Sequence, residues 1–295
     1  MVANLAVLVL EGGKGTRMKS ATPKPLHKIF GLPLLAHILQ TADTLKPAAN
    51  VILCGHQADL LKQTVKENYA NWGIKAELKF ALQKILNGSG SAVKYAMPVL
   101  KNYKQVLILA GDAPLIEAET LKQLVKHHNA KKAACTVLTV EVPNPKGYGR
   151  IVKENNFVRI VEESETDAKT APIKEVNSGM YIFEIAELAK VLKLLKPQGP
   201  KQEYYLTDTL ALLQQKGKKV REGVKVSVPS DVFIPEFDAI PDFRIRIPFN
   251  QIVQRSRSAI LCFHLNGNQR VGVPYEKIHL DSRTVVLVVI QLLVP

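Results

Sequence analysis

Residues 5–10 read LAVLVL, an unbroken apolar run that stops one residue before a glycine pair, Gly12 and Gly13. A strand that is apolar at every position is typical of a parallel sheet buried on both faces. Three further runs of this kind follow along the chain, at residues 51–55, 106–111 and 135–140. The sequence therefore predicts several buried strands. Ligands of such sheets bind just beyond the carboxyl ends of the strands.

Helical patterns alternate with these strands, at residues 34–45, 58–68, 91–100 and 118–128. This alternation predicts an α/β fold with right-handed crossovers and helices against the sheet. Between Gly147 and Phe183 the pattern changes to shorter strands around residues 155–156 and 177–179, which indicates a β-rich insertion. Two more helices are expected at residues 185–195 and 204–215.

The chain has 295 residues, with 40 Lys and Arg against 26 Asp and Glu, a formal charge of +14. This excess favours an anionic partner, which could be a nucleic acid, a membrane surface or a phosphorylated small molecule. The basic residues form no run of five or more, and no basic patch studded with aromatic residues is evident. We therefore expect no nucleic-acid partner.

Cys54, Cys135 and Cys262 are widely spaced, so neither a disulfide framework nor a zinc site is predicted. The first apolar run lacks a basic leader, unlike a signal peptide. The last one, residues 284–295, is too short to span a bilayer. The expectation is a cytoplasmic protein without a membrane partner, and the oligomeric state stays open.

The residues after the first strand, 12–17, read GGKGTR. Backbone amides of successive glycines can approach phosphate oxygens closely, and the Lys and Arg add charged donors. The loop is neither a Walker loop nor the dinucleotide fingerprint, because Met18 occupies the third glycine position. Alone, it fits an anion cradle or a plain tight turn.

Other motifs along the chain distinguish an anion-binding loop from a plain tight turn. The segment 10–18, followed by 23–26, resembles the signature of the sugar-1-phosphate nucleotidyltransferase family. The resemblance continues in order through residues 55–59, 83–92, 111–115, 144–152, 175–179 and 203–208, and it covers roughly residues 3–220. Within the family, the chain is most similar to the N-acetylglucosamine-1-phosphate uridylyltransferases.

The resemblance implies a Rossmann-like mixed, mostly parallel sheet with helices on both faces, of the nucleotide-diphospho-sugar transferase type, carrying a β-rich sugar-binding insertion. It implies a nucleotidyltransferase domain over residues 1–222. The implied partners are a nucleoside triphosphate, UTP, and a sugar 1-phosphate, N-acetylglucosamine 1-phosphate. The sugar phosphate would attack the α-phosphorus of UTP in line, assisted by Mg²⁺, giving UDP-N-acetylglucosamine and pyrophosphate.

Site residues carried over from the family fall into four groups. The catalytic cations are Arg17 and Lys24, and the Mg²⁺ ligand is Asp112. The nucleotide-binding residues are Leu10, Gly12, Gly13, Gly15, Thr16, Gln83, Gly88, Ser89 and Gly111. The sugar-binding residues are Gly149, Glu162, Asn177, Tyr205 and Thr207.

Some features depart from the family pattern. Glu11 stands where relatives carry a small alanine, and a carboxylate there would repel a triphosphate unless it turned away. Asn87 and Ser91 replace the usual Leu and His beside the base-reading residues. A second metal ligand of the family, an Asn soon after the 204–208 motif, has no counterpart before Asn250.

The composition also changes near Glu222: residues 1–222 hold 28 Lys and 4 Arg, whereas residues 223–295 hold 2 Lys and 6 Arg. We treat 223–295 as a C-terminal segment of uncertain nature, without the hexapeptide repeats of an acetyltransferase domain. Two alternatives remain open: transfer to another sugar 1-phosphate or from another nucleotide, and a non-catalytic nucleotide-sugar-binding paralogue.

Overall fold

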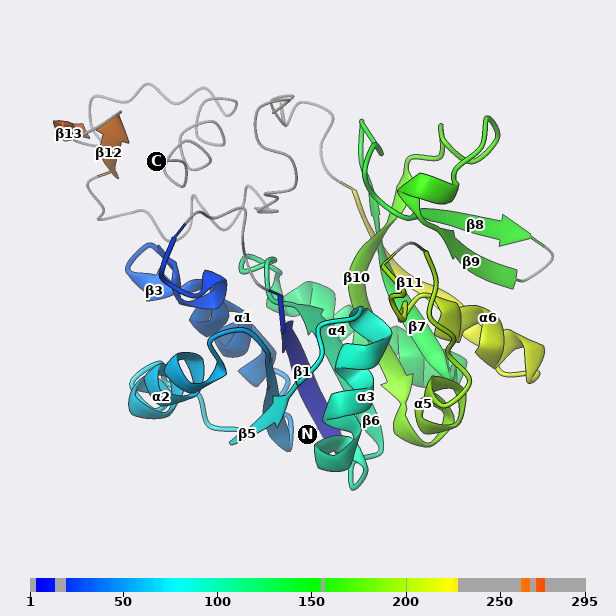
Figure 1. The fold of residues 1–295 in the computed structure, drawn as a ribbon, viewed down its shortest axis with the longest axis horizontal. Coiled ribbons are helices and arrows are strands. Elements are labelled where there is room, and N and C mark those ends of the chain that lie inside the picture. The colour runs from blue at the N-terminus through cyan, green and yellow to red at the C-terminus, as the bar shows by residue number, and fades with distance from the viewer. Residues whose placement is uncertain are drawn as a thin grey trace.

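The computed structural model describes residues 4–13, 20–154, 157–199, 201–227, 261–265 and 269–273. Within them, nine strands form one sheet in the order β11-β7-β10-β6-β1-β4-β5, with β8 and β9 as a hairpin beside β10 (Figure 1). Their bounds are β1 Leu5–Glu11, β4 Ala49–Cys54, β5 Glu77–Leu82, β6 Gln105–Ala110, β7 Cys135–Glu141, β8 Arg150–Glu154, β9 Phe157–Val161, β10 Glu175–Glu184 and β11 Val220–Ser227. Two short antiparallel pairs lie outside it: β2 Lys28–Ile29 with β3 Leu32–Pro33, and β12 Leu261–Leu265 with β13 Gln269–Val273.

Strand directions confirm the predicted mixed, mostly parallel sheet. The central strand β1 is parallel to both neighbours, β4 and β6, and β5 continues the parallel half beyond β4. Strand β10 runs antiparallel between β6 and β7, and β11 is parallel to β7 at the far edge. The carboxyl ends of β1, β4, β5 and β6 therefore meet at one edge of the sheet.

Helices cover both faces (Figure 1), as predicted. Their bounds are α1 Leu34–Asp43, α2 Ala58–Asn68, α3 Ser89–Leu100, α4 Ala118–Lys131, α5 Ile185–Leu192 and α6 Asp208–Gln215. Helices α1, α2 and α4 pack into one buried cluster and α3, α5 and α6 into another. Because side chains alternate along a strand, β1 sends Leu5, Val7 and Val9 into the first cluster and Ala6 and Leu8 into the second. Burying each Leu contributes roughly 1.5–3 kcal/mol.

Two strands differ from the sequence-based expectation. The edge strand β5 was not predicted, because only one of its six side chains is buried and its sequence lacks a long apolar run. Residues 177–179 do not separate two short strands but lie inside the single strand β10. The ladder with β7 shifts register between Asn177 and Tyr181, and Gly179 adopts a positive φ of 76° there. A glycine tolerates this geometry without the strain of a Cβ.

Strand β11 passes through residue 222, where the composition changes, and pairs with β7 from Val220 to Ser227. The sheet of the N-terminal part therefore extends to residue 227. Among the residues that the structure describes, no helix is both long and apolar enough to cross a membrane.

Candidate functional site

The predicted nucleotide-binding residues gather beyond the carboxyl ends of the parallel strands. Gly12 follows β1, Gln83 follows β5, and Gly111 and Asp112 follow β6. The edge of an α/β sheet where strands deliver their carboxyl ends is the usual place for a ligand. Segments that are about a hundred residues apart in the sequence thus reach one place.

Gly12 is enclosed by its neighbours. A Cβ added to it would overlap Oε1 of Gln83, so the Gln83 amide lies directly against the loop backbone. On the other side, a Cβ on Gly55 would overlap the carbonyl oxygen of Gly12. Both glycines are needed for this close approach, because any side chain would separate the loops after β1, β4 and β5. Gly13, by contrast, has open space around it, and Leu10 packs against the core.

The predicted base-reading segment is fixed to the segment that precedes α6. The amide of Gly90 donates to the carbonyl of Tyr204 at 2.7 Å, and the amide of Tyr204 donates to the carbonyl of Asn87 at 2.9 Å. Gly88 has a φ of 107°, and a Cβ there would overlap the Tyr204 carbonyl. Ser89 accepts a hydrogen bond from the Leu206 amide at 3.0 Å through Oγ. Backbone groups of Tyr204 and Leu206 are thus hydrogen-bonded to the 87–90 segment. For this reason α6 begins at Asp208 and not at the predicted Tyr204.

Four of the five predicted sugar-binding residues lie together. A Cβ on Gly149 would meet Glu162 Oε2 at 3.3 Å and the Cβ of Asn177 at 3.7 Å. Thr207 donates from Oγ1 to Glu162 Oε1 at 3.1 Å. These side chains come from the hairpin region, β10 and the turn before α6. The fifth, Tyr205, places its hydroxyl next to Gly199, 3.6 Å from a Cβ built there. Burial raises the pKa of this hydroxyl, and the charges of nearby carboxylates, Glu162 among them, raise it further.

Glu162 is an acceptor with a perturbed affinity for protons. Burial raises the pKa of its carboxyl, the Thr207 hydrogen bond lowers that pKa, and the nearby carboxylates of Glu165 and Asp208 raise it. Asn177 is already paired: its Oδ1 accepts from the Gly179 amide at 3.0 Å, and its amide contacts the Tyr181 hydroxyl. The cluster can accept hydrogen bonds from a hydroxyl-rich ligand, with Glu162 as its strongest acceptor.

Lys24 and Asp112 form an ion pair across the site. Lys24 Nζ donates to Asp112 Oδ2 at 3.2 Å, and the two side chains are 24% and 47% exposed. Pro23 and Pro25 flank Lys24 at the start of a short 3₁₀ helix, Lys24–Leu26, and hold its backbone in place. The predicted phosphate-binding cation and the predicted metal ligand are thus neighbours, both still reachable from solvent.

The remaining predicted loop residues, Gly15, Thr16 and the catalytic Arg17, lie outside the described residues. In the described part of the chain, no group of three or more His, Cys, Asp or Glu side chains is arranged to hold a metal ion. Mg²⁺ needs fewer protein ligands, because it takes one or two carboxylates and fills its octahedron with substrate phosphates and water. Asp112 fits that requirement.

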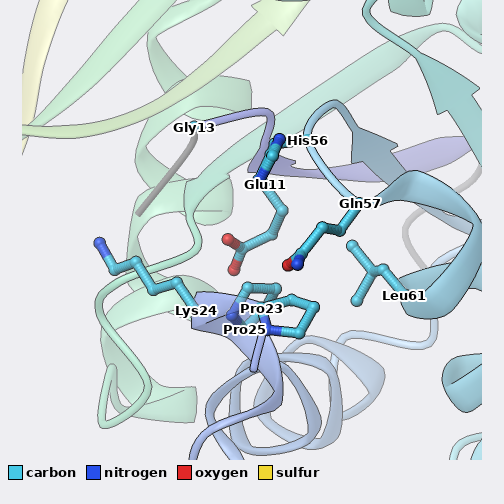
Figure 2. A pocket seen from close by; sticks show the side chains of 8 residues that line it. All are labelled: Glu11, Gly13, Pro23, Lys24, Pro25, His56, Gln57 and Leu61. Carbon is cyan, nitrogen blue, oxygen red and sulfur yellow. The ribbon is translucent and has the colours of Figure 1, made fainter. Parts of the chain in front are cut away.

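Glu11 ends β1 on the face covered by α1, α2 and α4. The side chain is 8% exposed, and its carboxylate lies between Lys24 and Gln57, next to Pro23 and Pro25 (Figure 2). Burial raises the pKa of its carboxyl to about 8; the charge of Lys24 lowers this pKa and that of Asp112 raises it. Oε1 has no hydrogen-bond partner among the described residues. The side chain has turned away from the glycine loop, into the protein.

Two residues of the 55–59 motif contribute to the site although the motif assigned them no role of their own. Gly55 contacts Gly12, and this contact sets the distance between two loops. Gln57 has a positive φ of 52° and donates from Nε2 to the Ala21 carbonyl at 3.2 Å, which ties the loop after β4 to the Pro23–Pro25 segment. Left-handed backbone at a non-glycine residue has no clear sequence signal.

The family assignment rests on a match to most of the chain. The sequence model of the family described as "Nucleotidyl transferase" matches residues 6–227. The chain belongs to this family. The match ends where β11 ends, so the nine-stranded sheet of the described residues lies within it except for Leu5, the first residue of β1.

Curated relatives agree with the family. The "Bifunctional protein GlmU" of Streptococcus suis is 37% identical over 222 residues, which are 74% of this chain and 46% of that protein. The protein of the same name from Clostridioides difficile is 38% identical over 219 residues, with the same coverage of both chains. For the Lactococcus lactis protein of that name the match is 39% over 268 residues, 90% of this chain and 55% of that protein. The chain spans about half the length of these relatives.

Solved structures confirm the fold. A UDP-glucose pyrophosphorylase complexed with UDP-glucose has a TM-score of 0.62 at 22% identity, over 76% of this chain and 91% of that chain. A putative glucose-1-phosphate thymidylyltransferase from Bacillus anthracis has a TM-score of 0.61 at 17% identity, over 75% and 88%. At these identities the likeness supports the architecture alone.

Proposed function

We propose that this chain transfers the uridylyl group of UTP to N-acetylglucosamine 1-phosphate, giving UDP-N-acetylglucosamine and pyrophosphate. The observation that carries the proposal is the convergence of three groups at one edge of the sheet. These are a glycine loop closed by Gln83, the Lys24–Asp112 pair, and the hydrogen-bonding cluster around Glu162. Membership of the nucleotidyl transferase family supports the reaction class. The resemblance to the N-acetylglucosamine-1-phosphate uridylyltransferases supports the choice of substrates.

The nucleotide would lie on the loop that follows β1. Gly12 and Gly13 leave room for the ligand beside their backbone, and the Gln83 amide lies against that loop, where it can pair with the edge of the base. The Gly88 carbonyl accepts from Gln83 Nε2 at 3.4 Å, so the Gly88 backbone helps to orient the Gln83 amide. The Asn87 and Ser91 departures lie beside this part, so another base is the nearest alternative.

The sugar 1-phosphate would lie in the cluster of Gly149, Glu162, Asn177 and Thr207. Gly149 allows a sugar to approach the backbone, and Glu162 accepts hydrogen bonds from hydroxyl groups. Thr207 orients Glu162 by its hydrogen bond. Positioning of this kind supplies much of the rate enhancement in a displacement between two bound anions.

The chemical step would be an in-line displacement. A phosphate oxygen of the sugar 1-phosphate forms a bond to the α-phosphorus of UTP, and the bond from that phosphorus to the bridging oxygen of pyrophosphate breaks. No proton has to move, so the protein needs cations more than an acid and a base. Lys24 would neutralise phosphate charge as a point cation, and Arg17 would do so as a forked donor. Mg²⁺, held by Asp112 and the phosphates, would add Lewis-acid stabilisation when bound.

One observation favours a second candidate, a nucleotide-sugar-binding paralogue without turnover. The buried Glu11 lies beside the Lys24–Asp112 pair and, when it is ionised, places a negative charge next to the groups that would bind phosphates. The relatives are named bifunctional, but the chain matches only about half of their length. We therefore propose one activity, nucleotidyl transfer, and no second one. A cytoplasmic location stays a prediction.

The test is pyrophosphate release by the full chain from a panel of nucleoside triphosphates, each with a panel of sugar 1-phosphates, with and without Mg²⁺. We expect Mg²⁺-dependent release with UTP and N-acetylglucosamine 1-phosphate. Asp112→Asn should lose most of it, while Lys153→Met, which removes a lysine paired with Glu175 outside the site, should not. Binding of UDP-N-acetylglucosamine with no release from any pair would favour the paralogue. Release with another pair alone would correct the substrates.

A further inference from the structure

Two carboxylates end adjacent strands at the catalytic edge of the sheet. Strands β1 and β6 are in parallel register with Leu10 opposite Ala110, so Glu11 and Gly111 follow at the same level, with Asp112 next in the chain. The Glu11 carboxylate is packed directly on Gly111, because a Cβ added to that glycine would overlap both carboxylate oxygens and the carbon between them. The absence of a side chain at Gly111 is what makes room for Glu11 beside Asp112.

Glu11 lacks a hydrogen-bond partner that would explain its burial. It is 8% exposed, and its Oε1 has no hydrogen-bond partner within the described parts of the chain. Lys24, the cation whose charge acts on Glu11, donates to Asp112 at 3.2 Å and forms neither a hydrogen bond nor an ion pair with Glu11 in the described part of the chain. Buried charged groups are, as a rule, paired or bound to metals, because an uncompensated charge is costly to remove from water.

The charges of the three side chains point to a missing cation. When both carboxyl groups are ionised, they and the single lysine carry a net charge of −1 before any phosphate is bound. A triphosphate and a sugar phosphate would add several more negative charges to the same edge. A divalent cation between the carboxylates would offset this repulsion, and two carboxylates with phosphates and water are a ligand set that suits Mg²⁺ or Mn²⁺.

We propose that Glu11 is a second protein ligand of the divalent cation, which it binds together with Asp112. The inference rests on the proposed function, since the cation is the one that this reaction would use. Glu11 supplies Oε1, the oxygen without a partner, and Asp112 supplies its carboxylate from the other strand end. Cation binding takes Asp112 from Lys24, so the lysine ammonium becomes available to a phosphate group. Glu11, which by itself would repel phosphates, would then hold the cation that neutralises their charge.

The test measures metal binding directly, with no substrate present. Free Mn²⁺ is titrated into the full chain and quantified by its electron paramagnetic resonance signal, and Mg²⁺ is added afterwards as a competitor. The variants are Glu11→Gln, which keeps the shape and removes the charge, and Asp112→Asn. The matched control is Glu175→Gln, because Glu175 also has a buried oxygen without a partner among the described residues, but pairs its other oxygen with Lys153.

We expect Glu11→Gln and Asp112→Asn each to weaken Mn²⁺ binding by about tenfold or more, and Glu175→Gln to leave it unchanged. Glu11→Ala serves as a second variant, with circular dichroism to show that each protein is folded. Mn²⁺ binding of wild-type strength in folded Glu11→Gln and Glu11→Ala would overturn the inference. So would the absence of Mn²⁺ binding to the wild-type chain at millimolar metal.

The two proposals fail in different ways. Pyrophosphate release that requires Asp112, with Mn²⁺ affinity independent of Glu11, would refute the second ligand and leave the reaction standing. Mn²⁺ affinity that depends on both carboxylates, without pyrophosphate release from any substrate pair, would support the metal site and refute the reaction.

Discussion

Replacing Glu11 by glutamine should make the protein more stable, and increasingly so as the pH rises. The pKa of this carboxyl is raised from 4.5 to about 8 by burial, so folding favours the protonated form. The contribution of this carboxyl to the free energy of unfolding is fully present below pH 4.5. This contribution is lost as the pH rises through 8. Each unit of pKa difference corresponds to about 1.4 kcal/mol. The loss is therefore about 3 kcal/mol at pH 7 and on the order of 5 kcal/mol above pH 8.

Glutamine fills nearly the same volume and does not titrate, so Glu11→Gln should be free of this loss. The single tryptophan, Trp72, is buried in the core cluster that also holds Leu5, Val7 and Val9 of β1, and its fluorescence reports unfolding of this region. Urea unfolding would be followed from pH 5 to pH 9 with a chelator present. Glu67→Gln, on the exposed surface of α2, is the control.

We expect the stability difference between Glu11→Gln and wild type to grow by about 1.4 kcal/mol per pH unit up to about pH 8 and then level off. The Glu67→Gln variant should track the wild type at every pH. A Glu11→Gln difference that is constant with pH would refute the reasoning, because it would mean that the carboxyl does not titrate in a buried site.

Three further predictions follow from the contacts of the site. Gly111→Ala should destabilise the wild type by about 1–3 kcal/mol through overlap with the Glu11 carboxylate, but cost little in a Glu11→Ala background; additive free energies of urea unfolding would refute this coupling. Lys24→Ala should lower kcat by about a hundredfold in pyrophosphate release while the fold, checked by circular dichroism, is kept; an unchanged kcat would remove Lys24 from the site. Thr207→Val should raise KM for the sugar 1-phosphate more than it lowers kcat, because Glu162 loses its orienting hydrogen bond; the reverse pattern would argue against a sugar-binding role.

Local sequence patterns were sufficient where burial is uniform along an element. The run 5–10 is apolar at every position, and it became the central strand with helices on both sides. Helix α2 was predicted with its observed bounds, since its apolar spacing and its flanking residues agree. The strand β5 was missed because, among the described strands, it lies at the edge of the sheet and pairs with a neighbouring strand on one side alone. Its side chains are not uniformly buried, so its sequence is not a continuous apolar run like that of β1.

The site was predictable as a set of motifs and not as a geometry. The family motifs placed Gly149, Glu162, Asn177 and Thr207 in one group, and the fold brings their atoms together. The same motifs included Tyr205, whose hydroxyl lies by Gly199 and is affected by the charge of Glu162. A motif records which residue types recur in order, but the direction of each side chain depends on the packing of segments remote in the sequence.

By itself, the sequence determined the α/β class, the position of the glycine loop after the first strand and the family to which the chain belongs. These depend on residues that are near one another along the chain. Only the tertiary structure decided that the Glu11 carboxyl is buried, because three segments distant in the sequence surround it. These are the Gly111 turn, the Pro23–Pro25 segment and the loop at Gln57. A carboxylate on the end of a strand is exposed or buried according to what packs over it, and that packing is set by long-range contacts.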